Sequence, residues 1–285
     1  MPALAKNPAD YSRRSYTHLF AKRLELTLNT LSSLEDGQTH YEVLNFGGHL
    51  NNSVNVAAYY DVPNIAQKYN VDLVVIMWDS GGAGLEPYFD APLNKDGVPG
   101  RFADTEFLLQ SGLEKFKTGM PREFFDLCKK KNILDVSASG QFSINNYPKL
   151  LSDFDLRKGL IEMVGNPIYL LGQKLAGMKR DGEKPCELAV CYFPWPAMET
   201  FPLRPLETFP YKKDRAFWKE LCEDKKINFV DMTDVWQTCR LTYFPCSDMV
   251  GNDHFSADGH LLLGTLLAYE FIRDGIIPFK TPVSP

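Results

Sequence analysis

Two short apolar runs constrain the fold of this chain more than any other feature. They are VDLVVIMW at 71–78 and CELAVCYF at 186–193. Each is a continuous apolar stretch of strand length, which is typical of strands buried on both faces of a parallel sheet. We therefore expect an α/β protein with a mainly parallel sheet.

Helical patterns alternate with these runs. Amphipathic spacing predicts helices over 15–33, 214–226 and 257–275, and helical tendency also covers 54–69, 104–117, 121–131 and 147–179. Pro63 is expected to begin a new helical segment or to kink an old one. Shorter strands are predicted at 41–46 and 227–233, with a further short apolar piece at 132–137.

Composition limits the classes of partner. At 285 residues the chain can bury a sizeable core, as one large domain or two small ones. The net charge of −5 gives no electrostatic reason to expect nucleic acid or an anionic membrane. No apolar run approaches the roughly 20 residues that a membrane helix needs. We therefore expect neither nucleic-acid binding nor a membrane span, and the oligomeric state is left open.

The cysteines and the N-terminal residues indicate a compartment. Six cysteines, at 128, 186, 191, 222, 239 and 246, are scattered without CxxC spacing. They are expected to be free, partly buried thiols, which favours a reducing compartment and no zinc site. Residues 1–6 lack the basic-then-apolar layout of a secretory signal, so we expect a cytoplasmic protein.

Ser80 is the most conspicuous candidate in the chain. It follows the 71–78 run in the turn Asp79-Ser80-Gly81-Gly82. In an open parallel sheet, functional loops follow the carboxyl ends of strands, so a nucleophile could stand here. The alternative is that Asp79 and Ser80 only turn the chain while the two glycines permit its reversal. We favour the alternative, since a nucleophile also needs a base within about 2.6–3.2 Å.

Two stretches carry a resemblance to a known family. INFVDMT at 227–233 leads to HFSADGH at 254–260 and then to the last helical pattern. This resembles the C-terminal end of the SGNH (GDSL-like) hydrolase superfamily, where the catalytic histidine lies just before the final helix. YEVLNFGGHLNNS, followed by VDLVVIMW, resembles that superfamily's second strand, glycine loop and third strand.

The resemblance implies a three-layer α/β/α sandwich with a flavodoxin-like sheet, and ester hydrolysis by a serine without a cofactor. His254 is then the general base, oriented by Asp253 or, less favourably, by Asp248. Gly47 and Gly48 shape the oxyanion loop. His49 beside them could contact a ligand or be an ordinary surface residue, and we favour the surface residue. No histidine pair has metal-ligand spacing, so we predict no metal.

Several positions depart from the family. The Gly-Asp-Ser block that follows the family's first strand has no counterpart in residues 1–14. Leu50 stands at the place of an oxyanion glycine, and Gly251 stands where the family has its acid. Either the chain is shortened relative to the family, with Met1 just after that block, or the sheet closes differently. We favour the first.

Two functions follow. The first is an SGNH-like hydrolase acting on an ester or acetyl group, for instance in a small-molecule ester, a glycan or a lipid, with its nucleophile missing or replaced by Ser80. The second is a catalytically silent domain of the same fold that binds a glycan, a lipid or a protein partner. In both cases we expect one domain over 1–285, with a helical insertion or lid at about 85–185.

Overall fold

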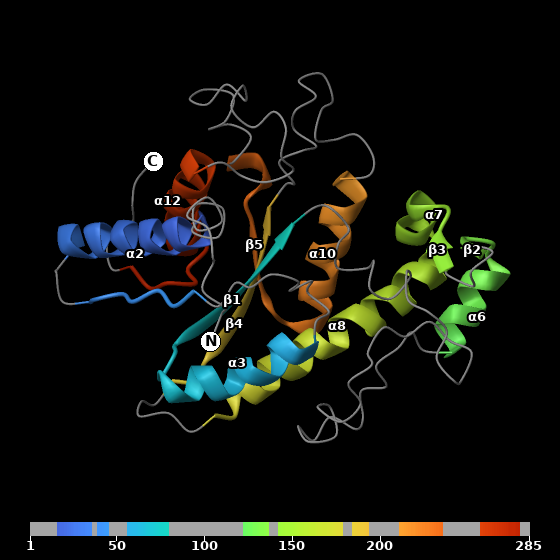
Figure 1. The fold of residues 1–285 in the computed structure, drawn as a ribbon, viewed down its shortest axis with the longest axis horizontal. Helices are drawn as coiled ribbons and strands as arrows, with labels where there is room; N and C mark the ends of the chain where they lie inside the picture. The colour runs from blue at the N-terminus through green and yellow to red at the C-terminus, as the bar shows by residue number, and fades with distance from the viewer. Residues whose placement is uncertain are drawn as a thin grey trace, which may run out of the picture. The chain divides into compact units, whose positions relative to one another are not determined.

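The computed structural model describes part of the chain. It covers residues 16–35, 39–45, 56–79, 122–136, 142–178, 184–193, 211–235 and 257–279. The chain forms two compact units, of which the first comprises Met1–His49, Phe193–Pro202 and Val230–Pro285. The second comprises Leu50–Tyr192 and Leu203–Phe229. Figure 1 labels the elements in the order used below.

Two long helices pack together in the described part of the first unit. Helix α2 (Tyr16–Glu35) packs against α12 (Ala257–Arg273), as Figure 1 shows. Their inner faces are apolar, and the buried side chains include Leu24, Leu28, Leu263, Leu267 and Phe271. The backbones meet closely at Gly264, where a Cβ would lie 2.7 Å from the carbonyl oxygen of Phe20. The absence of a side chain at this position therefore sets the distance between the helices.

A three-stranded sheet is the central β structure among the described residues. Its strands are β1 (Leu73–Asp79), β4 (Glu187–Phe193) and β5 (Asn228–Asp231), in the order β1-β4-β5. The sheet is mainly parallel, which confirms the predicted α/β class. In the central strand β4, residues 188–192 are all buried, as a continuous apolar run predicts.

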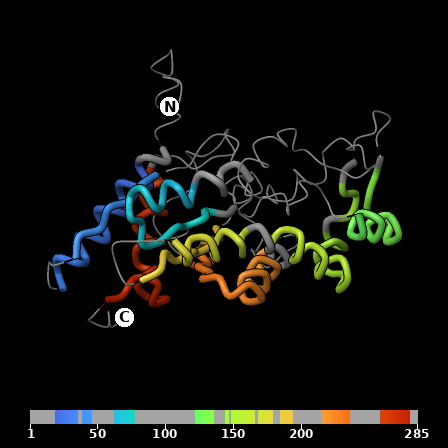
Figure 2. The backbone as a smooth tube through the Cα atoms, turned by 90° about the horizontal axis from the view of Figure 1, so that it is seen from below, coloured from blue at the N-terminus to red at the C-terminus, as the bar shows by residue number. Residues whose placement is uncertain are grey.

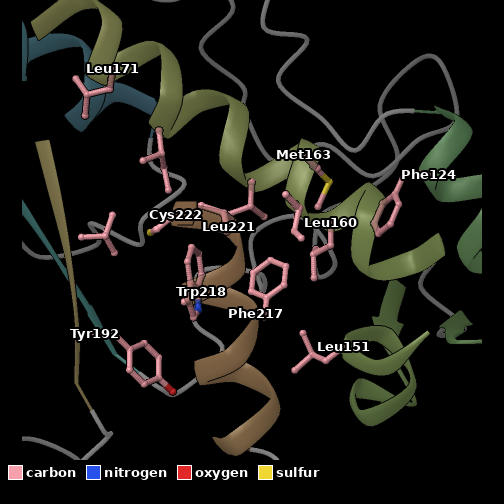
Figure 3. Packing of buried hydrophobic residues seen from close by; sticks show 14 of the residues in the cluster. Phe124, Leu151, Leu160, Met163, Leu171, Tyr192, Phe217, Trp218, Leu221 and Cys222 are labelled. Atoms are coloured by element: carbon pink, nitrogen blue, oxygen red, sulfur yellow. The ribbon is translucent and has the colours of Figure 1, made fainter. Parts of the chain in front are cut away.

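Helices α8 (Phe154–Ala176) and α10 (Tyr211–Lys225) carry much of the core of the second unit. They lie side by side in Figures 1 and 2 and are in contact. Helix α8 also contacts α3 (Val56–Lys68), α6 (Arg122–Lys130) and α7 (Tyr147–Ser152). Figure 3 shows the buried side chains that fill the space between these helices and strand β4, including Trp218, Leu221 and Tyr192.

The predicted insertion at about 85–185 contains α6, α7, α8 and a small hairpin. Strands β2 (Leu134–Val136) and β3 (Phe142–Ile144) pair antiparallel, with Leu134 opposite Ile144 and Val136 opposite Phe142. The predicted helix at 104–117 lies outside the described residues. The helix predicted at 121–131 is confirmed as α6.

Pro63 lies inside α3, which runs from Val56 to Lys68, so of the two alternatives it does not begin a new helix. Two other expectations about elements were wrong in part. The helical stretch at 147–179 is divided at Asp153, whose carboxylate accepts the N–H groups of Asp155 and Leu156 and so begins α8. The strand predicted at 41–46 is not observed in its described residues, 41–45, which belong to no strand.

Four helices end in the same backbone motif. Each has one residue in the left-handed region, and these residues are Asn70 (φ 51°), Asn132 (52°), Lys226 (55°) and Gly275 (69°). The next residue donates its N–H to the carbonyl five positions earlier, as Ile227 does to Cys222 at 2.9 Å. The four residues that donate this bond are all β-branched and apolar: Val71, Ile133, Ile227 and Ile276. This is the Schellman arrangement, which satisfies carbonyls left open at a helix end.

Lys226 is the member of this set whose side chain suits the position least. Replacing Lys226 with glycine is expected to raise the free energy of unfolding by about 1 kcal/mol, because a left-handed residue with a Cβ is strained. The measurement is urea unfolding of both proteins. Lys226→Ala is the control, since it removes the long side chain but keeps the Cβ. If both variants raise the free energy of unfolding equally, the prediction is wrong.

Candidate active site

The predicted site residues all lie outside the described part of the chain. These residues are Gly47, Gly48, His49, Ser80, Asp253 and His254, and the alternative acid Asp248 lies outside as well. The described elements that adjoin these residues in the sequence show where the chain enters and leaves the predicted site.

Each predicted loop adjoins a defined element. Strand β1 ends at Asp79, directly before Ser80. Helix α12 begins at Ala257, three residues after His254. Loops that follow the carboxyl ends of parallel strands are the usual place for ligand sites in α/β proteins.

The segment 39–45, which leads into Gly47, is held by side chains of α2. The Asn29 side chain donates to the Tyr41 carbonyl at 2.8 Å and accepts from the Tyr41 N–H at 2.8 Å. The Glu25 carboxylate accepts the Val43 N–H at 2.9 Å. The buried Ser32 hydroxyl donates to the Thr39 carbonyl at 2.6 Å. These contacts explain why 41–45 is in no strand: a helix supplies the partners that a neighbouring strand would supply.

Glu25 is also the charged member of this group. The N–H of Val43 and the ammonium of Lys22, 3.0 Å away, stabilise its carboxylate and lower its pKa. The bond to Val43 is therefore made by an ionised group, which makes it a charge-assisted hydrogen bond. The sequence predicts only an amphipathic helix here, and it does not distinguish Glu25 and Asn29 from ordinary solvent-facing residues.

A buried carboxylate near the end of α12 was not predicted. Glu270 is 4% exposed, and burial raises its pKa, while Arg273 opposes that shift. Arg273 donates to Glu270 at 2.9 Å and to Asp274 at 2.9 Å. The Glu–x–x–Arg spacing in the last turn could have indicated this pair. Because its charge is neutralised within the same helix, Glu270 acts as a structural group in this arrangement.

Four cysteines lie in the described part of the chain, and all four are free and buried as predicted: Cys128, Cys186, Cys191 and Cys222. Burial raises the pKa of the Cys128 and Cys222 thiols to about 12. Since the thiolate is the reactive form, these two side chains are packing groups rather than nucleophiles. Cys239 and Cys246 lie outside the described residues.

The described residues contain no group of three histidine, cysteine, aspartate or glutamate side chains arranged to hold a metal ion. In the same residues, the helices are too short or too polar to cross a bilayer.

Comparison with known proteins adds no relative. The chain matches no model of a protein family, no curated protein and no solved structure. Its functional assignment therefore rests on the sequence pattern and on the described elements.

Proposed function

We propose that this chain is an SGNH-like serine hydrolase domain that acts on an ester or acetyl group, for instance that of a carbohydrate or lipid. The observation that carries the proposal is the motif HFSADGH at 254–260, which runs directly into α12. In the proposal His254 is the general base, and Asp253, or less favourably Asp248, orients it. The strand INFVDMT that precedes this region is represented by β5.

The order of the sheet supports the proposal. In the flavodoxin-like order 2-1-3-4-5, the third, fourth and fifth strands are consecutive neighbours. Strand β1 has the place of the third strand in the resemblance, and β4 and β5 follow it in the order β1-β4-β5. The proposed complete architecture is a three-layer α/β/α sandwich, with the site at the carboxyl ends of the strands.

The proposed reaction is acyl transfer through a covalent intermediate. The hydrolase needs Ser80 in place of the missing family nucleophile, which is the interpretation of its turn that the sequence alone does not favour. His254 would then take the proton from the Ser80 hydroxyl as the serine oxygen attacks the ester carbonyl. Backbone N–H groups of the loop at Gly47 and Gly48 stabilise the oxyanion, and the alcohol leaves with the proton from His254. Water then attacks the acyl-serine by the same route, with His254 as the base. No cofactor is needed for these steps.

A fluorophosphonate probe tests the nucleophile directly. We expect folded protein to gain one covalent adduct, mapped to Ser80 by peptide mass spectrometry. Ser80→Ala and His254→Ala should abolish it, because the first removes the nucleophile and the second its base. Ser152→Ala is the matched control, since the Ser152 hydroxyl donates to the Pro148 carbonyl within its own helix and should not affect labelling. Heat-denatured protein should not react.

The departure at Gly251 favours the second candidate, a silent domain that binds a glycan, lipid or protein. Absence of labelling in folded protein would contradict the hydrolase and support this candidate. An adduct at a serine other than Ser80 would retain the hydrolase but overturn the proposed nucleophile.

A further inference from the structure

We infer that Glu25 and Asn29 are positioning residues: from α2 they fix the segment 39–45 in one register and so fix where the chain enters the glycine loop at 47–48. The consequence for catalysis rests on the proposed function, in which this loop carries the oxyanion donors. The contacts themselves lie within the described part of the first unit.

Asn29 makes the contact that determines which residue faces the helix. A strand neighbour offers one donor and one acceptor to the same residue, and the primary amide of Asn29 does the same for Tyr41. Both bonds are 2.8 Å long. Because Asn29 bonds both the N–H and the C=O of Tyr41, the contact specifies Tyr41 over its neighbours more strictly than a single hydrogen bond would.

The spacing of the partners matches along the two elements. The contacting positions on α2 are 32, 29 and 25, and on the segment they are 39, 41 and 43. Three or four helical residues rise about 4.5–6 Å, and two extended residues rise about 6.6 Å. The helix face and every second residue of the segment therefore advance together, in opposite chain directions. We call the side chains of Glu25, Asn29 and Ser32 the α2 clasp.

The clasp discriminates between registers. A slip of one residue would turn the N–H and C=O groups of the segment away from α2, because they alternate in direction along an extended chain. A slip of two residues would restore their direction but move the chain by about 6.6 Å. Oxyanion donors must lie within about 2.7–3.1 Å of the developing charge, so neither slip is compatible with a working loop.

Amide exchange measured by NMR tests the clasp itself. Asn29→Ala should accelerate exchange at Tyr41 by about tenfold, and Glu25→Ala should do so at Val43, because each loses its acceptor. Glu25→Gln should rescue Val43, since the amide oxygen still accepts its N–H. The control is Thr30→Ala, because the exposed Thr30 hydroxyl donates to the Leu26 carbonyl of its own helix. Exchange at Leu267 in α12 serves as the reference for global stability.

The positioning role is tested by the amide chemical shifts of Gly47 and Gly48. Relative to the wild type, these two shifts should change in Asn29→Ala and in Glu25→Ala. They should keep their wild-type values in Thr30→Ala and in Glu25→Gln. Unaltered exchange at Tyr41 and Val43 would overturn the clasp. Faster exchange with unaltered glycine shifts would overturn the positioning role.

These readouts do not depend on activity, so failure of the inference is distinct from failure of the proposed function. The latter is decided by fluorophosphonate labelling of the wild-type chain. If the wild type is labelled, the labelling rate should fall at least tenfold in Asn29→Ala and stay unchanged in Thr30→Ala. An equal rate in Asn29→Ala and the wild type would contradict the positioning role.

Discussion

Replacing Trp218 with alanine is expected to lower the free energy of unfolding by about 3–5 kcal/mol. Trp218 is 1% exposed and belongs to the largest side chains in the core of the second unit. Its ring meets that of Phe217 edge-on, with 5.2 Å between the ring centroids. Figure 3 shows it between α8 and β4, where its removal would leave a cavity that the surrounding side chains fill only in part.

This loss is large relative to the total free energy of unfolding of a domain. Domains are typically stable by about 5–15 kcal/mol, so the loss would be a substantial part of the total. Urea unfolding measures it, provided that the slope of free energy with denaturant is unchanged. Lys219→Ala is the matched control on the same helix, because the Lys219 side chain is 64% exposed. Similar losses in Trp218→Ala and Lys219→Ala would contradict the assigned burial.

The regular elements could be predicted because their signals are local. Continuous apolar runs at 71–78 and 186–193 became β1 and β4, and the helical spacing at 257–275 became α12. The two similar stretches, REFFDLCKKKNILDV and RAFWKELCEDKKINFVDM, both contain a helix, a left-handed residue and a strand. In these places, the propensity of each residue and its burial favour the same structure.

Other features depended on partners distant in the sequence. The alternating residues at 41–46 resemble a strand, but residues 39–43 are paired with side chains on α2, which no local pattern reveals. Strand β3 has three residues and exists through its pairing with β2. By contrast, Asp153 was a readable N-cap signal, since an aspartate precedes the apolar helix α8.

The candidate site was predictable only as a set of residue types. His254, Ser80 and Gly47 come from segments without regular periodicity, where spacing along the chain does not determine distance in space. The roles of His254 and Gly47 therefore come from the family resemblance, and that of Ser80 comes from its place after the 71–78 strand. Glu25 and Asn29 were missed for a different reason: polar residues on a helix are normally solvent-facing, so their use as backbone partners has no distinct sequence signal.

Replacing Gly264 with alanine is expected to destabilise the first unit by about 1–3 kcal/mol, although alanine favours helices. The new Cβ would lie 2.7 Å from the Phe20 carbonyl oxygen and 3.1 Å from the Leu24 nitrogen. Both atoms belong to the backbone of α2, so no side-chain rotation relieves the clash and the helices must move apart. The buried faces of α2 and α12 would then lose packing contacts.

Gly172→Ala provides a matched control in another helix, α8. A Cβ there would lie 3.5 Å from the Leu188 Cδ2, which is ordinary van der Waals contact. This variant is expected to gain up to about 1 kcal/mol from helix propensity alone. The same substitution should therefore change the free energy of unfolding in opposite directions at the two sites, as measured by urea unfolding. A gain at Gly264 would show that α2 and α12 do not approach as closely as described, because only the distance between their backbones makes alanine unfavourable there.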